Sequence, residues 1–120
     1  MGYDLHITRR EDWSEKGNDI SFEEWQAYVA GDPEMRIDGF AETQTASGEI
    51  VRIEAPGLTI WTRPSGDGHP RWFHHQRGRI DVKNPDAELF PKMWSIAQYF
   101  GARVQGDEGE CYDADGNIVR

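Results

Sequence analysis

Cysteine and long apolar runs are the first things this sequence lacks. Cys111 is the only cysteine in 120 residues, so no disulfide forms within the chain, and a single thiol suits a reducing compartment. No apolar run approaches the roughly 20 residues needed to cross a bilayer. The first residues turn charged at Arg9-Arg10-Glu11-Asp12 before any secretory h-region develops. We therefore expect a cytoplasmic protein without a membrane partner.

Basic residues are also scarce. The chain has 13 Lys and Arg against 22 Asp and Glu, which gives a formal net charge of −9. Such an excess repels nucleic-acid phosphates and favours a basic protein as partner. Leucine occurs only three times, but aromatic residues make up 12% of the chain and provide the bulk for one core. A single α+β domain spanning residues 1–120 is the expected organisation.

The hydrophobic pattern predicts two helices and a mostly antiparallel sheet of about six strands. Ser21 and Glu24 form a capping-box pattern before an amphipathic segment that Gly31 and Pro33 end. A second helix is predicted from Asn84-Pro85 to Gly101, with Pro91 as a kink or as the mark of a later start. Both helices are expected on one face of the sheet. Period-two alternation or turn residues indicate strands at 3–8, 37–43, 49–54, 58–63, 71–76, 79–82, 103–105 and 110–113.

Carboxylates are most concentrated near the end of the chain. Asp107, Glu108 and Glu110 lie within five residues, and a second acidic set, Asp12, Glu15 and Asp19, lies in the first long loop. Carboxylates this dense can hold a hard cation, act as acid and base, or meet a basic partner. The spacing around Asp113 and Asp115 does not match a calcium-binding EF-hand loop. We predict that Asp107, Glu108, Glu110, Asp12, Glu15 and Asp19 bind a basic protein partner.

An anionic small-molecule site is the alternative. The segment 71–77 interleaves cations with aromatics, and the glycine- and proline-rich stretch 64–70 precedes it. The alternative site is the cleft between this stretch and the Arg71–Arg79 strand pair. A binding protein or an enzyme would take its ligand contacts there from His69, Arg71, His74 and Arg77.

No metal, cofactor or catalytic group is predicted. Adjacent residues on a strand point to opposite faces, so His74 and His75 are poorly placed to hold one ion. Cys111 sits beside Tyr112 in a hydrophobic pattern typical of a structural thiol. Phosphate-binding glycine loops and nucleophile elbows are absent from the sequence. We therefore expect a protein that is not an enzyme.

Several stretches resemble a group of small acidic bacterial proteins of unassigned biochemical activity. They are residues 2–9, 22–25, 82–86, 92–97 and 105–110. In size, acidity and mixed pattern the chain also resembles immunity proteins, which bacteria make against secreted toxins. The resemblance implies an inhibitor that neutralises a basic toxin or effector by occluding its surface. A homodimer formed through exposed tryptophans is a further alternative.

Overall fold

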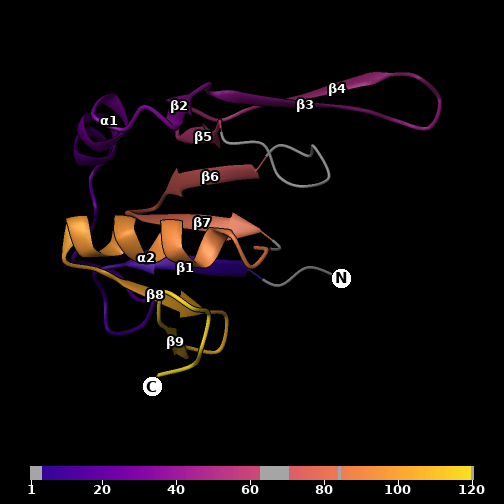
Figure 1. Cartoon of the computed structure of the whole chain (residues 1–120). Coiled ribbons are helices and arrows are strands. Elements are labelled where there is room, and N and C mark those ends of the chain that lie inside the picture. Colours follow the sequence, from indigo (N-terminus) through magenta and orange to yellow (C-terminus); the bar gives the residue numbers. More distant parts are fainter. Residues whose placement is uncertain (1–3, 63–70, 84, 120) are drawn as a thin grey trace.

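Two helices pack on one face of a seven-stranded antiparallel sheet, as the α+β prediction requires (Figure 1). The computed structural model describes residues 4–62, 71–83 and 85–119. The sheet order is β2-β5-β6-β7-β1-β8-β9. Its strands are β1 (Asp4–Thr8), β2 (Met35–Ile37), β5 (Leu58–Trp61), β6 (Arg71–Gln76), β7 (Arg79–Lys83), β8 (Arg103–Gly106) and β9 (Cys111–Tyr112). A separate hairpin consists of β3 (Phe40–Gln44) and β4 (Ile50–Glu54).

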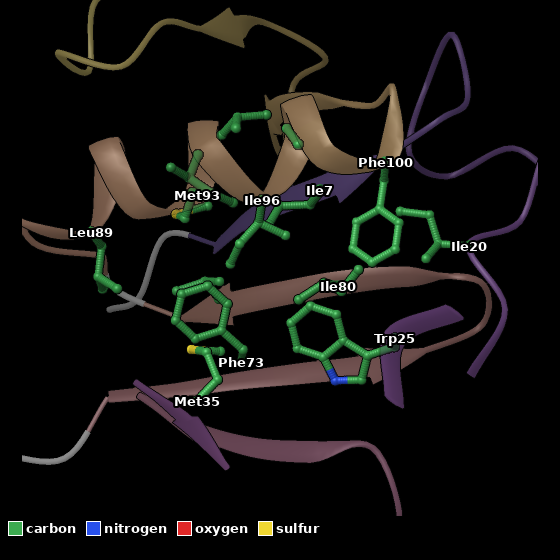
Figure 2. Packing of buried hydrophobic residues seen from close by; sticks show 14 of the residues in the cluster. Ile7, Ile20, Trp25, Met35, Phe73, Ile80, Leu89, Met93, Ile96 and Phe100 are labelled. Carbon is green, nitrogen blue, oxygen red and sulfur yellow. The ribbon is translucent and has the colours of Figure 1, made fainter. Parts of the chain in front are cut away.

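The core lies between the helices and one face of the sheet (Figure 2). Successive residues of a strand alternate between faces, so β1 turns Leu5 and Ile7 toward the helices and His6 toward the other face. Phe73 of β6 and Ile80 of β7 extend the same apolar surface, and both are fully buried. The hydrophobic alternation read from the sequence thus separates an apolar face from a polar one.

Helix α1 (Phe22–Ala30) begins where the capping box predicts. The Ser21 hydroxyl accepts a hydrogen bond from the Glu24 amide at 3.1 Å, and the Glu24 carboxylate accepts one from the Ser21 amide at 3.1 Å. Trp25 then enters the core with no exposed surface, and its indole nitrogen donates to the Thr59 hydroxyl at 2.9 Å. The cap and this contact fix the helix over β2 and β6.

Helix α2 (Leu89–Phe100) begins later than the Asn84-Pro85 pattern predicted. The Asp86 carboxylate accepts a hydrogen bond from the Glu88 amide at 2.9 Å and closes a turn before the helix. Pro91 is the third helical residue, where its missing N–H would have no partner within the helix. Of the two interpretations of Pro91, the mark of a later start is confirmed. The helix packs on β1 and β8.

The predicted strand over 37–43 is wrong because Gly39 interrupts it. Gly39 has φ of +73°, a left-handed conformation that breaks the extended chain between β2 and β3. The β3–β4 hairpin leaves the main sheet and extends away from it (Figure 1). The main sheet therefore has seven strands where about six were expected, and the hairpin adds two more outside it.

Four sequence features fall outside the described residues. They are the start of the first predicted strand at Tyr3, the stretch 64–70, the Asn84 cap and the terminal Arg120. None of the helices in the described part of the chain has the length and apolar character needed to cross a membrane.

Candidate functional site

Polar side chains form a row across the sheet face that points away from the helices. His6 on β1 lies opposite Asp81 on β7 and opposite Gln105 on β8, and Asp81 lies opposite His74 on β6. Directly opposed residues of antiparallel strands share a face, so these side chains are neighbours. The sequence pattern left open whether the histidines converge. The register brings His6 and His74 to either side of one carboxylate.

His6 is held between two carboxylates. Its Nδ1 lies 2.6 Å from the Asp81 Oδ1, and its Nε2 lies 2.8 Å from the Asp107 Oδ1. The ring is almost completely buried, whereas the Asp107 side chain is 40% exposed. Asp81 also accepts hydrogen bonds from the Arg79 Nε at 2.9 Å and the Gln76 Nε2 at 2.7 Å. Asp81 is therefore the buried carboxylate of this cluster, and Asp107 is the partly exposed one.

The geometry requires a protonated His6 ring. A neutral imidazole has a single N–H, but both ring nitrogens here meet carboxylate oxygens. Burial by itself would lower the pKa of His6, and the hydrogen bonds and charges of Asp81 and Asp107 outweigh it, so the pKa is raised above 6.5. Burial alone would likewise raise the pKa of Asp81, but the hydrogen bonds from His6 and Gln76 hold it below 3.8.

The loop 9–19 crosses over this cluster and places Trp13 on it. The Trp13 ring stacks on the His6 ring with 3.9 Å between centroids and 12° between planes. Its indole nitrogen donates to the Asp107 carbonyl at 3.2 Å, and its amide donates to the Gln105 Oε1 at 2.7 Å. The Gln105 amide nitrogen donates in turn to the Glu11 carbonyl at 2.9 Å. These contacts tie the loop to the β8–β9 hairpin.

Two arginines fix the ends of the same loop. Arg9 makes two hydrogen bonds to the Glu24 carboxylate, at 2.6 and 3.0 Å, and donates to the Phe100 carbonyl. Arg10 is buried and donates to the carbonyls of Gly17, Trp13 and Arg77 and to the Asp19 carboxylate. Because each guanidinium contacts several parts of the chain, the loop has a defined shape despite its polar sequence.

The structure brings most of the predicted acidic residues together. The Asp12 Oδ2 lies 3.3 Å from the position that a Cβ on Gly109 would occupy, so the loop and the turn 106–110 are side by side. We call the surface formed by Asp12, Trp13, Glu15, Asp107, Glu108 and Glu110 the acidic Trp13 surface. Asp19 lies apart from it, next to Gly78, in an ion pair with Arg10 at 2.7 Å.

Three acids of this surface, Asp12, Glu15 and Glu108, form no ion pair within the described residues. Some acids elsewhere do, for example Asp32 with Lys92 at 2.5 Å and Asp38 with Arg36 at 2.6 Å. Glu15 and Glu108 are exposed, and Trp13 is only partly buried. A partly exposed aromatic ring thus lies on the same loop as the unpaired carboxylates of Asp12 and Glu15.

Among the described residues of the alternative anionic-ligand site, the two arginines lie apart from each other. Arg71 and Arg77 bracket the two ends of β6. Arg71 is buried, lies 4.2 Å from the Trp61 ring centroid and pairs with Asp86 at 3.2 Å. Burial holds the pKa of His74 below 6.5, so its ring is neutral beside Asp81 at neutral pH. His69 lies outside the described residues.

Other features of the described chain supply no further chemistry. Histidine, cysteine, aspartate and glutamate form no metal-binding group of three within residues 4–62, 71–83 and 85–119. A hollow of about 340 Å³ lies between α2 and the β8–β9 strands, with Trp94, Tyr112 and Val119 among its walls. Cys111 is a buried free thiol whose sulfur lies 3.9 Å from the Gln105 amide nitrogen, on the polar face of the sheet.

Sequence reasoning missed three members of the cluster. Asp81, Gln105 and Trp13 carried no motif, and only strand register makes the first two neighbours of His6. The available signal was the position of His6 on the polar side of an alternating strand, where a buried polar residue requires partners. Comparisons with protein-family models, with curated proteins and with solved structures found no match for this chain.

Proposed function

We propose that this protein binds and blocks a cationic protein, in the manner of a toxin-immunity protein, through the acidic Trp13 surface. The observation that carries the proposal is the placement of Trp13, stacked on His6 and partly exposed, on a surface where Asp12, Glu15 and Glu108 form no ion pair within the described residues. Complementary charge increases the rate of encounter with a basic partner. A central tryptophan is the residue type that most often supplies lasting affinity.

The rigidity of the surface supports the same conclusion. Trp13 is fixed by its stacking on His6 and by hydrogen bonds from its amide and its indole nitrogen. A partner that docks on it would order few additional rotamers, so less binding free energy is lost to conformational entropy. The proposed protein acts by occlusion, with Trp13 and the acids around it as the contact surface for the partner.

The partner for the test is the toxin domain of a secreted effector, if a gene next to that of this chain encodes one. Association is measured by stopped flow at low and at physiological salt. The double variant Asp12→Asn/Glu108→Gln should associate about tenfold more slowly at low salt, and the difference should shrink as salt screens the charges. The control is Glu23→Gln/Glu49→Gln, which removes two charges from exposed residues elsewhere.

The contribution of Trp13 to binding is tested with a second pair of variants. Trp13→Ala should weaken binding by about 30-fold, corresponding to a loss of about 2 kcal/mol for a central aromatic. Trp94, which is 40% exposed on α2, provides the comparison variant Trp94→Ala, for which no change is expected. Equal rates for the two double variants, or equal affinities for the two tryptophan variants, would refute the proposal.

A further inference from the structure

His6 is the point at which three separate parts of the chain meet. Its ring contacts Asp81 of β7, Asp107 of the 106–110 turn and Trp13 of the 9–19 loop. The Asp107 carboxylate also accepts a hydrogen bond from the Asp4 amide at 3.3 Å. The loop and the turn that carry the acidic Trp13 surface therefore converge on one titratable ring.

We propose that His6 is a proton-operated clasp: its imidazolium holds the 9–19 loop and the 106–110 turn together, and loss of the proton releases Asp107 and Trp13. In its consequence for partner binding, this inference rests on the proposed function. The structural change itself belongs to the free protein and needs no partner.

When His6 loses its proton, Asp107 and not Asp81 should be released, because the two carboxylates differ in their exposure and in their distance from the ring. A neutral ring keeps one N–H, and Asp81 is the better partner for it, at 2.6 Å with its side chain only 10% exposed. The ring nitrogen that faces Asp107 then presents a lone pair to a carboxylate at 2.8 Å, which is repulsive. Asp107 is the partly exposed group, so it is the one that moves to water.

The charges around the ring reinforce this release. The charged groups around it are Asp81 and Arg79 from β7, Asp107 from the turn and Asp12 from the loop, and His74 of β6 lies on the other side of Asp81. With His6 protonated and His74 neutral, the three carboxylates face two cations. Deprotonation leaves three carboxylates with Arg79 alone, so repulsion between the acidic turn and the acidic loop increases. The Trp13 ring also loses the imidazolium that it covers.

The raised pKa of His6 sets the range in which the clasp opens. Below 6.5 the ring is protonated and the clasp is closed, and it opens as pH rises through the higher value that His6 has in the folded protein. The acidic Trp13 surface should therefore be ordered at a pH below the folded-state pKa of His6 and loosen at a pH above it.

An NMR titration of the free protein from pH 5 to 9.5 tests the clasp. The His6 ring resonances should titrate with a pKa above 6.5. The amide resonances of Trp13 and of the 106–110 turn should shift with the same midpoint, and hydrogen-exchange protection of the Trp13 amide should fall at least about tenfold across it. Amide shifts in loop and turn that do not follow His6 would overturn the inference.

Two variants test whether Asp107 couples the titration of His6 to the 9–19 loop. Asp107→Asn removes only the partly exposed carboxylate, so it should lower the His6 pKa and abolish the coupled shifts of the Trp13 amide. His74→Gln is the matched control, because His74 faces Asp81 without contacting the loop, and it should leave the coupled transition in place. An unchanged His6 titration in Asp107→Asn would contradict the clasp. Since no partner is present, either result is separate from the outcome of the binding experiment.

Discussion

The carboxylate of Asp81 is the group whose removal should cost this fold most for a single polar side chain. Asp81 accepts hydrogen bonds from His6, Arg79 and Gln76 at 2.6 to 2.9 Å. The side chains of His6 and Arg79 are only 3% and 10% exposed. Asp81→Ala leaves both cations buried without this carboxylate, and breaking a buried ion pair from one side typically costs about 3–5 kcal/mol. That is a large part of the stability of an ordinary domain.

Urea unfolding followed by tryptophan fluorescence measures the loss directly. The comparison variant is Glu54→Ala, which breaks a pair with Arg52 whose side chains are 75% and 48% exposed and should cost at most about 1 kcal/mol. A loss below about 1 kcal/mol for Asp81→Ala would refute the claim that a buried charged cluster holds this face together.

The difference in the free energy of unfolding between wild type and Asp81→Ala should depend on pH, and the pKa shifts of Asp81 and His6 give its direction. The pKa of Asp81 is held below 3.8 in the folded state, so its contribution is present above 3.8 and is lost as pH falls through the folded value. The pKa of His6 is raised, so its contribution is present below 6.5 and is lost as pH rises through the folded value. The stability difference between wild type and Asp81→Ala should therefore be largest between these two ranges.

Two further predictions concern local structure. Ser21→Ala removes the hydroxyl that caps α1 and should lower the free energy of unfolding by about 1 kcal/mol in urea titrations, whereas Ser21→Asp should retain most of it. Gly57→Ala places a Cβ 2.0 Å from the backbone oxygen of His75, a clash that should lower the midpoint of thermal unfolding by several degrees or more. Gly31→Ala, whose Cβ would have no neighbour nearer than 3.6 Å, is its control, and a loss as large as that of Gly57→Ala would contradict the steric argument.

Local signals in the sequence predicted most of the fold. The Ser21–Glu24 pattern located the start of α1 because capping satisfies amides within one turn and needs no distant partner. The gap between the predicted strands 71–76 and 79–82 also located a turn, and positive φ at Arg77 and Gly78, +53° and +77°, suits a tight hairpin. The errors occurred where one residue decided between competing patterns. Gly39 ended a strand that looked continuous, and Asp86 closed a turn where a helix was expected.

The candidate site was predicted only in part, because its members come from separate segments of the chain. Strand register makes three of these segments, β1, β7 and β8, neighbours. The acids of the 9–19 loop and the 106–110 turn were recognised by their density, but Asp107 also holds a buried ring, which composition does not indicate. Asp81 is 75 residues from His6 in sequence and becomes its neighbour only because β7 lies beside β1. Strand order is set by the packing of the whole sheet and is not contained in any local pattern.

The most direct test of the proposed function is a hydrogen-exchange footprint of the complex with such an effector toxin domain. Added protection on binding should concentrate in residues 11–15 and 106–110, while the exposed β3–β4 hairpin and the outer face of α2 exchange as in the free protein. Protection centred on that hairpin or on α2, with the acidic Trp13 surface unchanged, would contradict the proposed function.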